Sequence, residues 1–161
     1  MSRLLNEKKA VPRPTKLLLG LVLLLATPFA VAQNTLGELL DAGATKLSPE
    51  EFRQEVVLRT LVGPNPTGVP MELMYAASGV VQGKSAALGT NVGTQQVGGA
   101  LASIDGVWTI DDSTRICTSM VIGRAMLPFR CEYWFKYKDD YFVALSDSDP
   151  KAKVIRRTVK Q

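Results

Sequence analysis

The second part of this 161-residue chain consists of short strand-like runs separated by clusters of turn-forming residues. The runs are residues 106–110, 114–122, 129–137, 141–145 and 153–159. Asp, Ser, Gly and Pro fill the gaps between them, and these residue types favour turns. Because short strands that follow one another through short turns pair as neighbours, the pattern predicts an antiparallel β-meander.

Two short helices are predicted at the start of the folded domain. The first covers residues 35–47, where leucines recur at near-helical spacing. The second runs from about residue 49 to 62, because its beginning carries the residues of a capping box. These residues are Ser48, Pro49 and Glu51. Gly63 followed by Pro64 is expected to end this helix.

Between the helices and the meander, the sequence changes from a strand pattern to a glycine-rich one. Met71, Leu73 and Tyr75 recur at a period of two, which predicts a strand. Residues 83–99 contain five glycines among Ser, Thr, Asn and Gln, which predicts a long mobile loop or weak edge strands. Together the elements predict an α+β fold, in which two short N-terminal helices pack on a small antiparallel β-meander.

Residues 1–32 have the three-part layout of a secretory signal peptide. Five basic residues precede the apolar run of residues 17–32, which ends at a small-x-small site. Cleavage is expected between Ala32 and Gln33, and it would leave no stable membrane anchor. The alternative is an uncleaved anchor, but this run of sixteen residues is short against the roughly 20 of a spanning helix.

The exported chain is expected to form one α+β domain. Residues 33–47 would form the short N-terminal helix or linker, and residues 48–161 would form the domain with its Gly-rich loop at 83–99. The leader contains five of the 19 Lys and Arg residues and one of the 15 Asp and Glu residues, so 14 of each sign remain. A balanced charge gives no argument for a nucleic acid as partner.

Histidine does not occur in the chain. Its absence from the sequence excludes Ser-His-Asp and Cys-His nucleophiles and any zinc site that needs imidazole. Residues 147–150 lack the glycine and the distal glutamate of a calcium loop. Six aspartates fall in predicted turns, where Asp is favoured for its bonds to the backbone: Asp111, Asp112, Asp139, Asp140, Asp147 and Asp149. We therefore expect no enzymatic activity, no cofactor and no metal site. An enzyme that depends on carboxylates or on a metal is the least favoured alternative.

Cys117 and Cys131 are the only two thiols of the sequence, and an exported chain enters an oxidising compartment. The midpoint between them falls in the turn before residue 129, so the two residues face each other across a hairpin. We predict a structural disulfide between them. A redox pair is the alternative, but catalytic dithiols usually lie two residues apart near a helix N-terminus.

Several short motifs follow one another within residues 48–147. They are Glu72-Leu73-Met74-Tyr75 with Gly79, Gly106-Val107-Trp108, Arg115-Ile116-Cys117, and Cys131 through Tyr137. This order resembles a broad group of small secreted bacterial proteins of unknown function, which share a Gly-x-Trp strand, a Leu/Ile-Cys strand and a Cys-plus-aromatic strand. The chain departs from the group at residues 77–79, where an Asp-Gly turn is usual. The resemblance implies an α+β fold with a small antiparallel sheet, and it implies no activity.

Aromatic residues on the predicted strands form a candidate ligand face. These residues are Tyr75, Trp108, Tyr133, Phe135 and Tyr137. Strand alternation places the last three on the same face as Cys131, with Trp134 on the other face. Such a face suits an apolar molecule or a glycan, and a face of the hydrophobic core is the alternative.

The sequence as a whole favours a non-enzymatic binding or interaction protein that works in the periplasm or is secreted. One form of this function is the binding of a small hydrophobic ligand between the helices and the aromatic face. The other form is the binding of a periplasmic protein, such as a member of an envelope complex or a toxin that the chain neutralises.

Overall fold

The computed structural model describes residues 34–86 and 101–161, of which 52% are in strands and 11% in helices. The predicted cleavage site at Ala32 and Gln33 lies outside the described residues, as does most of the predicted loop at 83–99. Neither helix of the described part has the length and hydropathy that crossing a membrane requires.

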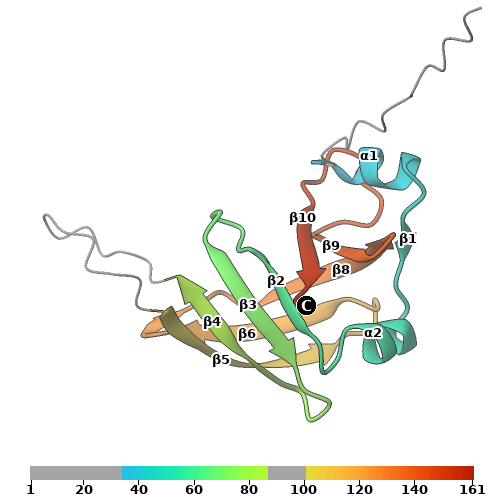
Figure 1. The fold of residues 1–161 in the computed structure, drawn as a ribbon. Coiled ribbons are helices and arrows are strands. Elements are labelled where there is room, and N and C mark those ends of the chain that lie inside the picture. Colours follow the sequence, from blue (N-terminus) through green and yellow to red (C-terminus); the bar gives the residue numbers. More distant parts are fainter. Residues whose placement is uncertain (1–33, 87–100) are drawn as a thin grey trace, which may run out of the picture. The chain divides into compact units, whose positions relative to one another are not determined.

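Eight strands follow one another in an antiparallel meander that closes on itself as a barrel (Figure 1). They are β2 (Thr60–Pro64), β3 (Pro70–Tyr75), β4 (Val80–Ala86), β5 (Leu101–Ile110), β6 (Ile116–Ile122), β8 (Arg130–Tyr137), β9 (Asp140–Ala144) and β10 (Ile155–Val159). Each strand pairs with the next, and β10 also pairs with β2, where Val159 lies opposite Leu61. Every strand of the barrel therefore has a neighbour on both sides.

Two helices and two short strands surround the barrel. They are α1 (Leu36–Asp41), β1 (Thr45–Lys46), α2 (Pro49–Glu55) and β7 (Ala125–Met126). The strand β1 pairs with β8, and β7 pairs with the end of β6. Both helices begin with a capping box, formed by Thr35 and Glu38 in α1 and by Ser48 and Glu51 in α2. The predicted start of the second helix is thus confirmed.

The predicted α+β fold, with helices packed on a small meander, is wrong. The predicted strands do form an antiparallel meander, but the meander closes into a barrel because residues 60–64 are a strand and not the end of a helix. The helix α2 stops at Glu55, and Leu58 then adopts a φ of 68° and donates its backbone N–H to the carbonyl oxygen of Tyr75 at 2.8 Å. This turn leads the chain into β2, which completes the barrel.

The first residues of the predicted glycine-rich loop also belong to a strand. Residues 83–86 continue β4; all four pair with β5, and residues 83–85 also pair with β3. A Cβ atom at Gly83 would collide with the carbonyl oxygen of Glu72 in β3. Glycine permits such a close approach where strands bend around a small barrel, so this residue marks a bend in a strand and not a loop.

The helix α2 closes one end of the barrel with an aromatic cluster. Phe52 is 1% exposed, and its ring centroid lies 5.5 Å from Tyr75, 5.3 Å from Trp108 and 5.1 Å from Trp134, all in edge contacts. Such contacts stabilise a core beyond the area that they bury. The barrel is therefore filled by side chains at the α2 end.

The helix α1 packs on the outside of the barrel. Leu36 and Leu39 are fully buried in a cluster with Phe135 of β8 and Phe142 of β9. Their neighbours Trp134 and Val143 point to the other side, into the barrel. The sheet formed by β8 and β9 is thus covered on both faces, and this explains the continuous run of apolar residues in β9.

Candidate ligand-binding site

A cavity of about 380 Å³ lies inside the barrel. Its entrance is formed by residues 65–67, residues 127–129 and Leu145, where β2, β8 and β9 begin or end. The strand β3 leads from this entrance down to Tyr75, whose ring lines the cavity and also touches Phe52. The entrance therefore lies at the end of the barrel away from α2, and the aromatic cluster forms the floor.

Most of the cavity wall is apolar. Met71 and Leu73 contribute from β3, Met120 from β6 and Trp134 from β8. Among the few polar groups on the wall is the hydroxyl of Thr118, a residue that is 6% exposed. Small-molecule sites commonly have such a wall, with a few polar groups that orient the bound molecule.

A buried arginine also lines this cavity. Arg157 of β10 is only 4% exposed, and its Nη1 donates hydrogen bonds to the carbonyl oxygens of Pro64 and, at 3.4 Å, Arg156. Gly63 leaves the space for this group, since a Cβ atom there would lie 2.7 Å from Nη1. Burial lowers the pKa of Arg157, but an arginine remains charged at any physiological pH.

The charges on the cavity wall do not cancel. Arg130 and Glu132 form an ion pair of 2.5 Å between Nε and Oε1, which satisfies both groups. Among the described residues, no carboxylate lies within ion-pair distance of Arg157. Residues 87–100 contain no Asp or Glu that could provide one. The lining therefore carries one net positive charge.

Tyr75 offers a second polar group at the floor of the cavity. The residue is 3% exposed, and its hydroxyl makes no hydrogen bond to another side chain or carbonyl of the described residues. Burial raises the pKa of Tyr75 well above its ordinary value. The phenol therefore stays protonated and remains available as a hydrogen-bond donor inside the barrel.

The five aromatic residues of the predicted ligand face do not share one surface. Tyr75 lines the cavity, whereas Trp108 lies beside Phe52 and donates its indole N–H to the carbonyl oxygen of Ala76 at 2.8 Å. Tyr133, Phe135 and Tyr137 point outward from β8 and pack in the cluster that includes α1. Strand alternation explains this division, because Trp134 is the residue of β8 that faces the cavity.

No sequence motif predicted that Arg157, or the pair formed by Arg130 and Glu132, belongs to a site. Arg157 belongs to a C-terminal stretch rich in Lys and Arg, residue types that mostly lie at the protein surface. A signal was nevertheless present, because Ile155, Arg157 and Val159 recur at a period of two and therefore face the same side. An arginine that shares its face with two β-branched residues is expected to point toward a core.

The predicted disulfide between Cys117 and Cys131 is confirmed. The two residues lie directly opposite each other in the pairing of β6 with β8. The next pair toward the entrance joins Thr118 to Arg130, and both of these residues line the cavity. The disulfide therefore holds the cavity wall together at the seam between these strands.

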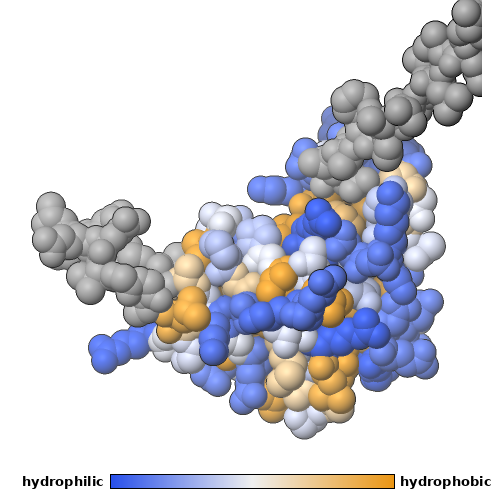
Figure 2. Space-filling model, viewed as in Figure 1, coloured by the Kyte–Doolittle hydropathy of each residue, from blue (hydrophilic) through white to orange (hydrophobic). Residues whose placement is uncertain are grey.

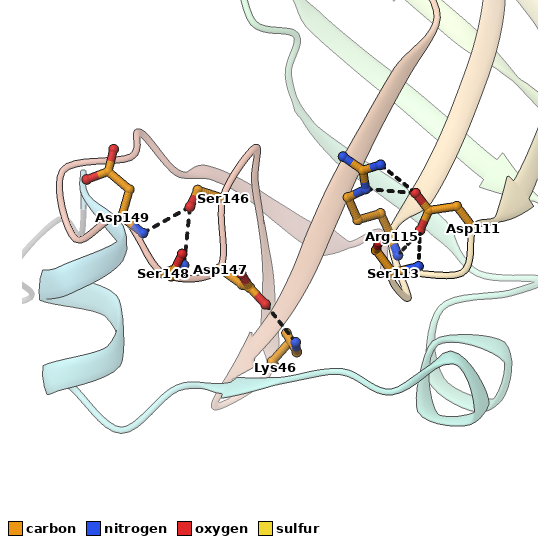
Figure 3. A network of polar contacts seen from close by, with 8 residues as sticks. All are labelled: Lys46, Asp111, Ser113, Arg115, Ser146, Asp147, Ser148 and Asp149. Carbon is orange, nitrogen blue, oxygen red and sulfur yellow. Dashed lines mark hydrogen bonds and ion pairs between the residues drawn. The ribbon is translucent and has the colours of Figure 1, made fainter.

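Figure 3 shows the polar contacts made by aspartates that lie in two turns. Asp111 accepts hydrogen bonds from the backbone N–H groups of Ser113 and Arg115 and forms an ion pair of 2.7 Å with the Arg115 guanidinium. Asp147 pairs with Lys46 of β1 at 2.8 Å. The sulfurs of the two cysteines lie close to Asp111, but they are joined to each other and the carboxylate is bound to Arg115. This group of ligand atoms therefore does not form a metal site.

A second hollow, of about 660 Å³, lies at the α2 end of the barrel. Its lining is mainly charged, and Glu55 forms an ion pair of 2.5 Å with Lys136 and accepts a hydrogen bond from the Tyr141 hydroxyl at 3.3 Å. Asp140 is likewise paired, with Arg156, at 2.5 Å. Glu55, Lys136 and Asp140 are thus already paired, whereas the smaller cavity inside the barrel has a mainly apolar wall, so that cavity is the better candidate for a ligand.

Comparisons of the chain with protein-family models, with curated proteins and with solved structures found no match, and the resemblance to small secreted bacterial proteins stays a prediction.

Proposed function

We propose that this chain is a non-enzymatic binding protein that holds one small, mainly apolar molecule inside its β-barrel. The observation that carries this proposal is the cavity of about 380 Å³ with its apolar wall. Ligand pockets are typically about 300–1,000 Å³ in volume, and barrels of eight strands are just wide enough to hold one small ligand. At ~30 Å³ for each water-sized group, the volume of 380 Å³ suits a molecule with about a dozen non-hydrogen atoms.

The entrance to the cavity supports an apolar ligand. Phe129 and Leu145 line it and are 66% and 58% exposed. Figure 2 shows further hydrophobic surface at this end of the barrel, around the ends of β4 and β5, where Leu101 is exposed. Exposed apolar side chains at the rim of a cavity let an apolar molecule leave water before it reaches the interior.

The proposed setting is the periplasm or another compartment outside the cytoplasm. The signal-like residues 1–32 support export, and the disulfide between Cys117 and Cys131 is compatible with it, since disulfides persist in oxidising compartments. A protein partner is the second candidate for this function. Met126 and Phe129, close to each other in the chain, are 77% and 66% exposed, and exposed apolar side chains that lie together often mark a protein-binding surface.

The test is the binding of 1-decanol, a neutral probe of suitable size, measured by native mass spectrometry and by the fluorescence of Trp134. We expect one molecule of decanol per chain. Met120→Trp, which fills the cavity, should abolish this binding, whereas Val107→Trp, at an exposed position of β5, should leave it unchanged. A wild-type chain that binds no decanol, or a Met120→Trp variant that binds it equally well, contradicts the proposal.

A further inference from the structure

We infer that the molecule held in the barrel is an organic anion: an apolar compound with one carboxylate group, which Arg157 binds from the cavity wall beside Pro64. This inference rests on the proposed function, because it assigns the chemical class of the ligand for the same cavity.

The burial of Arg157 is the first argument. A charged group that is 4% exposed loses nearly all of its hydration, and proteins normally compensate such a group with an opposite charge. Among the described residues, its hydrogen-bond acceptors are carbonyl oxygens, those of Pro64 and Arg156, and the carboxylate that attracts it from a longer distance, Glu132, is already paired with Arg130. A carboxylate in the cavity would supply the opposite charge that the chain does not provide.

The hydrogen bonds of Arg157 are the second argument. Both of its bonds within the described part of the chain come from Nη1, which is held at the carbonyl oxygen of Pro64. The N–H groups of Nε and Nη2 are left for a ligand, and a guanidinium binds a carboxylate best through two parallel N–H groups. Because Gly63 and Pro64 fix one side of the group, its free side is already oriented when the ligand arrives.

The number of charges on the wall is the third argument. Arg130 is satisfied by Glu132 at 2.5 Å, so one positive charge remains for the ligand. This balance favours a single carboxylate over a doubly charged phosphate. The protonated hydroxyl of Tyr75 adds a neutral donor, and the apolar side chains of Leu73 and Trp134 leave the rest of the molecule in a hydrocarbon-like environment.

The experiment compares decanoate, 1-decanol and decylamine, which share an alkyl chain and differ in charge, on the exported chain as purified. Charge-assisted hydrogen bonds contribute enough for about a tenfold or larger difference in Kd. We therefore expect decanoate to bind at least about tenfold more tightly than decanol, and decylamine to bind more weakly than either.

Two variants assign the preference to one side chain. In Arg157→Gln the preference should disappear, so that the ratio of the Kd for decanol to the Kd for decanoate falls to about one. Arg156→Gln removes the same charge from the next residue of β10, whose side chain faces solvent and pairs with Asp140, and it should keep the preference. If Arg157→Gln does not fold, the comparison of the three probes on the wild-type chain decides the matter.

The possible results separate the two proposals. Equal binding of decanol and decanoate by the wild type, or a preference that persists in Arg157→Gln, overturns the assignment of an anion and leaves the proposed function intact. A wild-type chain that binds none of the three probes overturns the proposed function itself.

Discussion

The backbone of Gly63 in β2 lies so close to Arg157 in β10 that a Cβ atom at the glycine would be 2.7 Å from Nη1 of the guanidinium. The two residues belong to the strand pair that closes the barrel. The absence of a side chain at Gly63 therefore has two effects. It lets the first and last strands of the barrel approach each other, and it leaves space for a charged group inside an apolar wall.

Gly63→Ala should weaken the pairing of β2 with β10 that closes the barrel, and it should displace Arg157 from its position on the cavity wall. The added methyl group would also collide with the carbonyl oxygen of Arg156, so β10 or the arginine must move. We expect a loss of about 1–3 kcal/mol in the free energy of unfolding, as is usual for overpacking. Urea denaturation measures it, and a variant as stable as the wild type would contradict this reading of the contact.

Arg157→Met should separate stability from binding. Replacing an uncompensated buried charge with an apolar side chain of similar length is often neutral or stabilising. We expect the free energy of unfolding to stay equal or rise, while the affinity for decanoate falls about tenfold or more. Chemical denaturation measures the free energy of unfolding, and titration of the same sample with decanoate measures the affinity. A large loss of stability would show that the arginine is mainly structural.

Removing the disulfide should weaken the seam between β6 and β8. The bond spans a sequence separation of 14, and the chain-entropy model gives about 3 kcal/mol for a loop of about 15 residues. The double variant Cys117→Ser/Cys131→Ser should therefore unfold at a lower urea concentration, by about that free energy. Its stability should not respond to a reductant, whereas the wild type should become less stable when reduced.

Phe52→Ala should destabilise the α2 end of the barrel. The ring is 1% exposed and touches three other aromatic rings, so its removal leaves a cavity that the neighbours cannot easily fill. We expect a loss of about 3–5 kcal/mol. Leu40→Ala, at a 41% exposed position of α1, is the control and should cost much less in the same thermal or urea measurement.

The pair formed by Asp111 and Arg115 should make stability depend on pH. Hydrogen bonds from the Arg115 side chain and backbone lower the pKa of Asp111 in the folded chain. The unfolded chain therefore binds this proton more readily, so the stabilisation is complete above the unfolded-state pKa of about 4 and is lost as the pH falls through the folded-state pKa. Carboxyl NMR titrations should show that the pKa of Asp111 rises in Arg115→Gln, and an unchanged pKa would argue against this cause.

Local features of the fold could be predicted from the sequence because they depend on neighbouring residues. The capping box of Ser48 and Glu51 is formed within one helical turn, and the turn chemistry of Asp111 is equally local. The pairing of Cys117 with Cys131 followed from the position of one turn between them. In each case the residues that decide the structure lie within about 15 positions of one another.

The closure of the barrel could not be predicted in this way. Leu61 pairs with Val159, almost a hundred positions later, and no local signal joins them. The apolar pattern of residues 56–62 fits a helix as well as a strand. Gly63, which follows it, predicts a helix end from the sequence, but in the structure it leaves the space that the Arg157 guanidinium occupies. The cavity was missed for the same reason, because it exists only once β2 and β10 meet.

The pairing of β10 with both β9 and β2 also bears on self-association. In residues 60–86 and 101–159, each strand of the barrel uses its backbone hydrogen-bonding groups on two neighbours, so a second copy finds few open positions for adding a strand. Truncation before Ile155 would uncover β2 and β9 at once. The shortened chain should then form fibrils or amorphous aggregates that the untruncated chain resists.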